Sequence, residues 1–352
     1  MINIKFLPAE NGDCILILTD NFNILIDGGM GRTYHRRLRD ELEELEQIDL
    51  VVLTHIDEDH ILGLIELFKD EEIRPKVKKV WFNSLAKLSE LFGDKYDKTK
   101  EYLIDSDTDK NVSYKQGESL ESLLDGIDYE LVYLEKQKVY TFKDLELQIL
   151  SPNIRHLENL YNHWSEDKEK RDEKESKNIN NSMELSESIE ALYAKKFEND
   201  TRRANKSSIA FNLKYNQKNY LFLADANMST VRESLIKDHD TKHLYAEMVK
   251  ISHHGSRKNT NQKFLDVVSS HKFVISTNGA LYNHPDKEVL SRIIKNPKRD
   301  DREIEFLFNY EENDYKDSFT FSDDELASEE YNFKLVFAEE DGVEIKGVEN
   351  GL

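Results

Sequence analysis

The sequence predicts an α/β protein folded as an αββα sandwich, in which two mixed β-sheets pack face to face and helices cover their outer faces. Two observations predict this class. Each half of the chain begins with a series of short apolar runs typical of strands, and each half ends in segments with the apolar spacing of helices. Sheets and helices in this order are buried most simply as layers around a shared core. With 352 residues, the chain is long enough to bury a sizeable core.

The first half supplies one series of elements. Asn-Gly and Asp-Asn pairs separate three strands near the N-terminus. A helix, a buried strand, a second helix, another strand and a largely helical polar segment follow, and a hairpin over 139–150 ends the series. The expected strands are 2–7, 14–18, 23–26, 50–53 and 77–82, and the expected helices are 33–47, 61–69 and much of 84–125.

The second half repeats the pattern after a break. Residues 154–203 are charged and asparagine-rich, and are too long for a simple loop, so we expect a helical insertion there. The expected strands are then 209–215, 220–223, 248–252 and 273–276, and the expected helices are 229–238, 260–269 and 285–295. The predicted organisation is one domain over 1–300 with this insertion, followed by an acidic extension over 301–352 that packs on the domain and holds strands at 303–308 and 333–337.

Metal-ligand side chains crowd the turn that follows the buried strand at 50–53. Four of them fall within six residues: His55, Asp57, Asp59 and His60. His55 and Asp57 alternate along an extended segment and can point to one side of it. Asp59 and His60 are adjacent, so they can serve a second ion if the chain turns there. The alternative, an exposed acidic loop with two chance histidines, is disfavoured because apolar elements flank the run on both sides.

This run resembles the HxHxDH signature of the metallo-β-lactamase fold, in the HxDxDH variant of the nuclease-like domain of the ComEC competence proteins. Further motif pieces of that branch occur in chain order, at 11–17, 24–29, 205–209, 221–225, 250–256 and 276–285. The sequence departs from the pattern in three places: Asp57 replaces a second histidine, Ala224 replaces a glycine, and 276–285 matches loosely. The resemblance implies a dinuclear metallohydrolase and, within the branch, a nuclease.

Histidine nitrogens and carboxylate oxygens bind hard and borderline divalent ions, so we expect two ions, Zn²⁺ or Mn²⁺. The predicted metal ligands are His55, Asp57, Asp59, His60, Asp225, His253 and His284. The sequence leaves open which of three histidines binds metal: His253, His254 or His284. Adjacent residues at the end of a strand point in different directions, so only one of His253 and His254 is expected to contact metal.

Roles beyond metal binding follow from the same residues. Asp59 is predicted to accept the proton of the attacking water, and His254 and His284 to act on substrate oxygens. Asp27 is predicted to orient a metal-binding histidine or, alternatively, only to fix its Asp-Gly-Gly turn. The predicted substrate contacts are Ser256, Asn278, Asn283, Arg36 and Arg203.

Composition narrows the functions. The net charge of −21 disfavours nucleic-acid binding over the whole surface, although local basic strips occur around Arg36 and Arg203. The leading hypothesis is a phosphodiesterase or nuclease that cleaves DNA or RNA with metal-activated water, in DNA processing or defence, with an operon-encoded protein partner. The alternatives are a metallohydrolase of a small phosphodiester, lactone or thioester, and a non-catalytic interaction module.

Targeting signals are absent from the sequence. The N-terminus has no signal-peptide pattern, and no apolar run approaches the roughly 20 residues of a membrane helix. Cys14 is the only cysteine, which excludes an intramolecular disulfide. The protein is therefore expected to be cytoplasmic and without a membrane partner. Its oligomeric state is not determined by the sequence.

Overall fold

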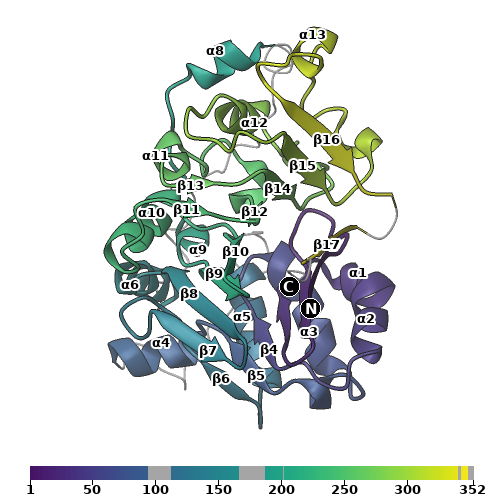
Figure 1. Ribbon diagram of the computed structural model, residues 1–352. Helices are drawn as coiled ribbons and strands as arrows, with labels where there is room; N and C mark the ends of the chain where they lie inside the picture. The colour runs from purple at the N-terminus through teal and green to yellow at the C-terminus, as the bar shows by residue number, and fades with distance from the viewer. Residues whose placement is uncertain (94–111, 166–186, 201, 340–341, 348–352) are drawn as a thin grey trace.

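Two β-sheets form the centre of the computed structural model, which describes residues 1–93, 112–165, 187–200, 202–339 and 342–347 (Figure 1). Among these residues, the first sheet has seven strands in the order β17-β1-β2-β3-β4-β5-β6. The second has eight, in the order β16-β15-β14-β12-β10-β9-β8-β7. The predicted sandwich of two mixed sheets flanked by helices is confirmed.

The first sheet combines the N-terminal half of the chain with one C-terminal strand. β1, β2 and β3 are antiparallel neighbours, and β3 to β6 run parallel. β17 pairs antiparallel with β1, placing Ile4 opposite Ile345. The strands are β1 (Ile2–Phe6), β2 (Ile15–Thr19), β3 (Asn23–Ile26), β4 (Leu50–Val52), β5 (Lys79–Trp81), β6 (Asp128–Glu130) and β17 (Val343–Lys346).

The second sheet is also mixed. β7, β8, β9 and β10 are antiparallel neighbours, whereas β10, β12, β14, β15 and β16 run parallel. The strands are β7 (Val139–Phe142), β8 (Leu145–Ser151), β9 (Ala210–Tyr215), β10 (Lys218–Phe222), β12 (Met248–Lys250), β14 (Lys272–Ile275), β15 (Ile304–Phe308) and β16 (Phe333–Phe337). A separate ribbon pairs β11 (Leu244–Tyr245) with β13 (Val268–Ser269).

Helices cover the outer faces of both sheets (Figure 1). In the first half they are α1 (Gly31–Thr33), α2 (Arg39–Glu43), α3 (Glu58–Lys69), α4 (Leu85–Phe92), α5 (Val112–Leu123) and α6 (Ile154–Ser165). In the second half they are α8 (Ile189–Tyr193), α9 (Arg203–Lys206), α10 (Met228–Lys237), α11 (Gln262–Leu265), α12 (Lys287–Ile294) and α13 (Asp323–Leu326). A π-helical turn, Tyr34–Leu38, joins α1 to α2.

Three apolar clusters correspond to the layers. One lies between the first sheet and helices that include α3, and another between the second sheet and helices that include α10 and α12. The third lies between the sheets, where Ile24 and Leu50 share a cluster with Phe211 and Tyr220. Alternate residues of a strand face opposite sides, so each sheet contributes to two clusters at once.

Several expected helices differ from the structure in their bounds. The helix expected over 33–47 is α1, the π-helical turn and α2, which together span 31–43. α3 begins at Glu58 rather than 61, so its first turn includes part of the metal-ligand run. α12 begins at Lys287 rather than 285. The single helix expected over 260–269 is wrong: Asn261 caps the short α11 by accepting from the Phe264 amide, and the β-branched Val267-Val268 pair leads into β13 instead.

The expected insertion and the expected C-terminal extension both contain regular elements. Of the insertion expected over 154–203, the structure describes α6, α8 and the approach to α9, and residues 166–186 lie outside the described part. Beyond residue 300, β15 and β16 extend the second sheet and β17 extends the first.

None of the described helices has the length and apolarity that crossing a membrane requires.

Candidate metal centre

The candidate centre starts at the turn between β4 and α3. Asp57 has extended backbone and directly precedes Glu58, the first residue of the helix. His55 therefore approaches the helix along extended chain with Asp57, whereas Asp59 and His60 lie in the first helical turn. The change of backbone conformation directs the two pairs of side chains differently.

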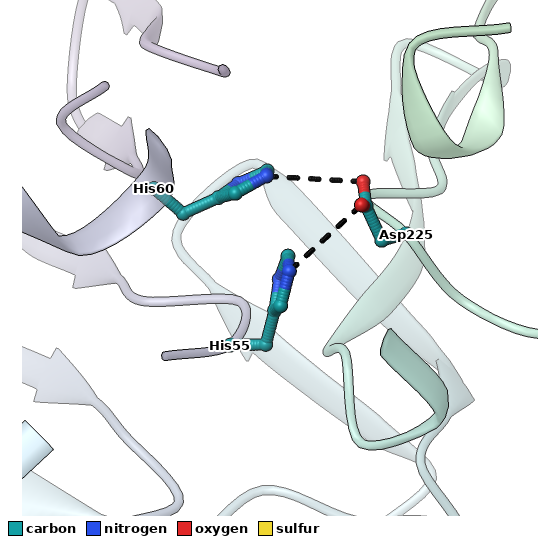
Figure 2. A group of neighbouring side chains, drawn as sticks. All are labelled: His55, His60 and Asp225. Atoms are coloured by element: carbon teal, nitrogen blue, oxygen red, sulfur yellow. Dashed lines mark ion pairs between the residues drawn. The ribbon is translucent and has the colours of Figure 1, made fainter. Parts of the chain in front are cut away.

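Asp225, which follows β10, faces four histidines. The Nε2 atom of His55 lies 3.9 Å from Oδ2 of Asp225, and Nε2 of His60 lies 3.8 Å from Oδ1 (Figure 2). Nε2 of His253 lies 3.5 Å from Oδ2, and Nε2 of His254 lies 3.8 Å from Oδ1. Each oxygen of one carboxylate is thus directed at a different pair of histidines.

Two further carboxylates complete this division. Oδ2 of Asp57 lies 3.7 Å from Nε2 of His55. Asp59 reaches the other pair, with Oδ1 3.8 Å from Nε2 of His60 and Oδ2 3.5 Å from Nε2 of His254. The Oδ2 group is His55, Asp57 and His253, and the Oδ1 group is Asp59, His60 and His254.

Several of the atoms that converge here lack a hydrogen-bond partner, and a bound metal ion would be a partner for them. Nε2 of His55, His60 and His254 and Oδ1 of Asp225 are buried and have no hydrogen-bond partner among the described residues. Buried polar atoms are rarely left in that state. Ligands that each bind one ion at about 2.1 Å in a tetrahedral arrangement lie about 3.4 Å apart, close to the separations seen here. Two sets of donor atoms each lie within 4.8 Å of one another, one from His55, His60 and Asp225 and the other from Asp59, His60 and His254, which is consistent with a dinuclear metal site.

Asp27 connects the two histidines of the β4–α3 turn. Its carboxylate lies 2.8 Å from Nδ1 of His60 and accepts from the amide and the hydroxyl of Thr54 at 2.8 and 2.7 Å. Because the Thr54 hydroxyl donates to Asp27, it accepts from Nδ1 of His55 at 3.0 Å. Both rings therefore carry a proton on Nδ1 and direct Nε2 at Asp225. This is the position that the predicted orienting role of Asp27 requires.

His253 and His254 are held in the same manner. Nδ1 of His254 donates to the Ser276 carbonyl at 2.7 Å, and Nδ1 of His253 lies 2.9 Å from Oδ1 of Asn259. Both histidines have left-handed backbone, with φ of 51° and 53°. Such a pair of non-glycine residues is strained, and strain of this kind gathers at functional sites. It also lets two consecutive rings face one carboxylate, which regular strand alternation does not allow.

Gly255 closes this turn. Its φ is +88°, and a Cβ built on it would lie 2.4 Å from Cβ of Pro285. Its carbonyl accepts from the amide of Asp286 at 3.0 Å. Glycine is needed here for both its conformation and the close packing, and it fixes the two histidines against the start of α12.

One family model and several solved structures match this chain. Residues 7–130, which include the β4–α3 turn, match the model of the Metallo-beta-lactamase superfamily. The two mixed sheets with flanking helices are the metallo-beta-lactamase fold. None of the curated proteins matches its sequence. The matching family model describes the superfamily and does not distinguish the ComEC branch from others.

Three solved structures align with this chain over almost its whole length at low sequence identity. PqqB of Methylobacterium extorquens, a Zn²⁺-bound structure, is 10% identical with a TM-score of 0.45, and the alignment covers 98% of this chain and 99% of that one. Igni18 of Ignicoccus hospitalis, described as a metallo hydrolase, is 12% identical with a TM-score of 0.42 and 99% coverage of both chains. YhfI of Bacillus subtilis is 10% identical with a TM-score of 0.38, covering 98% and 100%.

The open side of the candidate centre is the carboxylate side. The side chains of Asp57 and Asp59 are 27% and 24% exposed, whereas those of His55 and His60 are fully buried. A substrate in solvent therefore meets the aspartates first.

Protonation at the centre is set by these neighbours. Burial alone would raise the pKa of Asp225, but the surrounding histidines, His253 foremost, hold it well below its usual range, so the carboxylate is ionised. Burial alone would lower the pKa of His60, but Asp59 and Asp27 raise it well above its usual value. A metal that binds His60 must therefore displace a proton.

A buried ion pair behind the centre was not predicted. Lys250 and Asp13 are both buried and form an ion pair, and Oδ1 of Asp13 lies 3.7 Å from Nδ1 of His254. Burial would raise the pKa of Asp13, but Lys250 holds it below its usual value. Asp13 lies in the motif piece at 11–17 and Lys250 in the piece at 250–256. Their place in these motifs is the feature of the sequence that could have indicated a role at the centre.

Asp200 and Arg202 are two further residues that the sequence analysis missed. Oδ2 of Asp200 lies 3.4 Å from Nδ1 of His253, and Nη2 of Arg202 contacts Nε2 of the same ring. Arg203, the predicted substrate contact, is exposed at the start of α9. The basic residues around Arg203 indicated this segment, but the sequence does not show which of the two adjacent arginines contacts the centre.

The other predicted residues lie at various distances from the centre. The ring of His284 is centred 5.7 Å from that of His253, and its Nδ1 lies 3.6 Å from Asp286, so it borders the centre outside the two groups. Asn278 accepts from the Ala280 amide through its own side chain, and the Asn283 amide donates to Gly279, so both shape the loop before His284. The amide of buried Ser256 donates to the His253 carbonyl at 2.8 Å, so Ser256 belongs to the turn that holds this histidine. Among the described residues, no contact joins exposed Arg36 to the clustered ligands.

Proposed function

We propose that the protein hydrolyses phosphodiesters, in DNA or RNA, at a dinuclear metal site. The observation that carries this proposal is Asp225, which directs one oxygen at each of two His/Asp groups. Two divalent ions, when bound, supply Lewis acidity and lower the pKa of water toward about 7. The Oδ2 group would hold one ion and the Oδ1 group the other, with Asp225 shared.

The chain's own residues have separable roles in this reaction. Asp59 is a partly exposed carboxylate within 3.8 Å of both His60 and His254, so it would accept the proton of the attacking water. His284 borders the centre, but burial, then the charges of His253 and His254, hold its pKa well below the usual value. It would therefore contact the leaving oxygen as a neutral hydrogen-bond donor rather than as a strong acid.

Two observations bear on the size of the substrate. The ordered motif pieces that resemble the ComEC branch favour a polynucleotide. The net charge of −21 opposes binding of a long polyanion and favours a small phosphodiester. Both substrates carry the same reacting group and differ only in what is attached to it.

The test combines metal content with cleavage of single- and double-stranded DNA and RNA and of bis(p-nitrophenyl) phosphate, with zinc and with manganese. We expect about two metal ions per chain, and a loss of about 10²–10⁴-fold in kcat for Asp59→Ala. Asp144→Ala, a change at an exposed carboxylate in the β7–β8 hairpin, is the matched control and should leave activity unchanged. Two bound metals with no cleavage of any phosphodiester would contradict the proposal and direct attention to lactones and thioesters.

A further inference from the structure

The loop that leads into β2 contacts both chain segments that supply the Oδ1 group. A Cβ built on Gly12 would lie 1.6 Å from the carbonyl oxygen of Asp59, so the loop packs directly on the first turn of α3. The carbonyl of Gly12 also accepts from the Ser276 hydroxyl at 2.9 Å, and the Ser276 carbonyl accepts from Nδ1 of His254 at 2.7 Å. The loop therefore touches one member of the group directly and another through Ser276.

Asp13 places a buried carboxylate from this loop behind His254. Its side chain is 2% exposed, and its Oδ1 atom lies 3.7 Å from Nδ1 of His254, on the side of the ring away from the metal-facing Nε2. The carboxylate also lies near His60, because donor atoms of Asp13, Asp27 and His60 lie within 4.8 Å of one another. Oδ1 of Asp13 has no hydrogen-bond partner among the described residues. An unpaired buried acceptor costs free energy, and positive charge on the ring of His254 would offset that cost.

Lys250 holds Asp13 in one orientation. Nζ of Lys250 contacts Oδ2 of Asp13, and both side chains are buried, so Oδ1 is the oxygen left facing His254. Burial lowers the pKa of His254, whereas Asp225 and then Asp13 raise it, each by more than Lys250 lowers it. The ion pair is neutral overall, but it presents its negative end to this ring.

A role in stability alone does not account for this arrangement. Lys287 and Glu325 form a second buried lysine–carboxylate pair, with side chains 4% and 11% exposed. Both oxygens of Glu325 lie within 3.2 Å of Nζ of Lys287, and each also accepts from a backbone amide. That carboxylate is fully paired, as a purely structural group should be. Asp13 instead keeps one oxygen unpaired and directed at a candidate metal ligand.

We propose that Asp13 is a positioning residue of the metal centre, which Lys250 orients and which stabilises the ion of the Oδ1 group through His254. The inference rests on the dinuclear site of the proposed function and does not depend on the substrate. An ion bound at Nε2 draws electron density from the imidazole and makes its Nδ1–H more positive. A carboxylate near Nδ1 therefore attracts the ring more strongly when the ion is bound, and it strengthens metal binding.

The position of Asp27 provides a contrast between the two groups. Asp27 contacts His60 of the Oδ1 group directly and His55 of the Oδ2 group through Thr54. Asp13 lies near His60 and His254, which both belong to the Oδ1 group. Loss of the Asp27 charge should therefore weaken binding of both ions, whereas loss of the Asp13 charge should weaken binding of one.

The experiment titrates the metal-free full chain with Zn²⁺ in a calorimeter and compares the two binding steps in wild type and Asp13→Asn. We expect one step to weaken by about 10–100-fold in Asp13→Asn and the other to stay within about twofold of wild type. Glu325→Gln removes the carboxylate of the other buried lysine pair, so it controls for loss of stability and should change neither step.

Two further variants connect the effect to His254. On a His254→Ala background, Asp13→Asn should cause no additional loss of affinity, because the ring through which Asp13 acts is gone. The double variant Asp13→Leu/Lys250→Met leaves no uncompensated charge in the core, so it serves if Asp13→Asn does not fold, and it should show the same loss of one step. Urea unfolding of each variant shows whether the fold is retained.

Several outcomes would overturn the assignment. Equal weakening of both steps, or a change no larger than in Glu325→Gln, would make the pair a support for the fold alone. A further loss on the His254→Ala background would show that Asp13 does not act through that ring. If wild type binds two ions, Asp13→Asn weakens one, and no phosphodiester is cleaved, the proposed function fails while the assignment of Asp13 stands.

Discussion

Hydrogen bonding at single residues decides which atoms are directed at the candidate metal centre. In each of the four histidines that face Asp225, Nδ1 has an oxygen neighbour, and Nε2 is the atom that faces the carboxylate. Asp27 orients two of these four rings, because it contacts His60 directly and His55 through Thr54. Outer partners of this kind orient ligands and raise their basicity.

Replacement of Asp27 tests this arrangement. We expect Asp27→Asn to weaken zinc binding by about 10–100-fold, because the negative acceptor behind His60 is lost. Calorimetric titration of metal-free protein with Zn²⁺ gives the affinity, and urea unfolding shows whether the fold is retained. Asp144→Asn is the control. An unchanged affinity would mean that Asp27 only fixes the Asp-Gly-Gly turn.

At the scale of elements, helix α3 is fixed at both ends. At its first turn, a Cβ on Gly12 would lie 1.6 Å from the Asp59 carbonyl oxygen, so only glycine allows this loop to approach the helix. At its other end, Asp70 accepts from the amides of Glu72 and Ile73. Asp70 also accepts from the Tyr34 hydroxyl at 2.6 Å and from Arg39 at 2.9 Å. The helix that carries two predicted ligands is thus tied to the preceding helical segment.

The tie at Asp70 predicts a pH-dependent stability. Burial would raise its pKa, but the Tyr34 hydroxyl and the Glu72 amide lower it from 3.8 to about 2. Since the folded-state value is the lower one, the stabilisation is complete above about pH 4 and is lost as the pH falls toward 2. We expect Asp70→Asn to lower the free energy of unfolding by about 1–2 kcal/mol at pH 7, and by clearly less at pH 3.

Urea unfolding at the two pH values measures this difference. The same experiment on Asp144→Asn, where the carboxylate is exposed, should show no comparable dependence. A difference of equal size at pH 7 and pH 3 would mean that the carboxylate charge of Asp70 is not what stabilises this end of α3.

At the scale of the whole molecule, contacts between distant parts of the chain assemble the site. Asn309, after β15, donates to the carbonyl of Leu7 and accepts from the amide of Thr277. Lys250, at the end of β12, pairs with Asp13, which lies just before β2 in the other sheet. These buried polar contacts join the two sheets beside the candidate metal ligands, so they fix the position of one set of these residues relative to the other.

The Lys250–Asp13 pair provides a test at this scale. We expect Lys250→Met to destabilise the metal-free protein by about 3–5 kcal/mol, because the charge of Asp13 is then buried without a partner. The double variant Asp13→Leu/Lys250→Met should be less destabilised than Lys250→Met alone, since no uncompensated charge remains. Urea unfolding of the two single variants and the double variant measures both effects. Additive losses would show that the pair is not coupled.

The sequence by itself determined the layers and the first half of the site. Strand and helix periodicity depends on neighbours a few residues apart, so most strands and the α/β sandwich could be predicted. Helix bounds were less certain, and the helix over 260–269 was wrong, because local capping and pairing with β11 override apolar spacing there. The predicted ligands from His55 to His60 were visible in the sequence because they lie within six consecutive residues.

Only the tertiary structure decided how the remaining groups meet. Which oxygen of Asp225 faces which histidine depends on how the two sheets pack, and no spacing in the sequence encodes that distance. The left-handed turn at His253 and His254 brings both rings to the centre, where strand alternation predicted one. Arg202 rather than Arg203 contacts His253, and this likewise depends on the residue at which α9 begins. Side chains far apart in sequence are positioned by the packing of whole layers, which local patterns do not record.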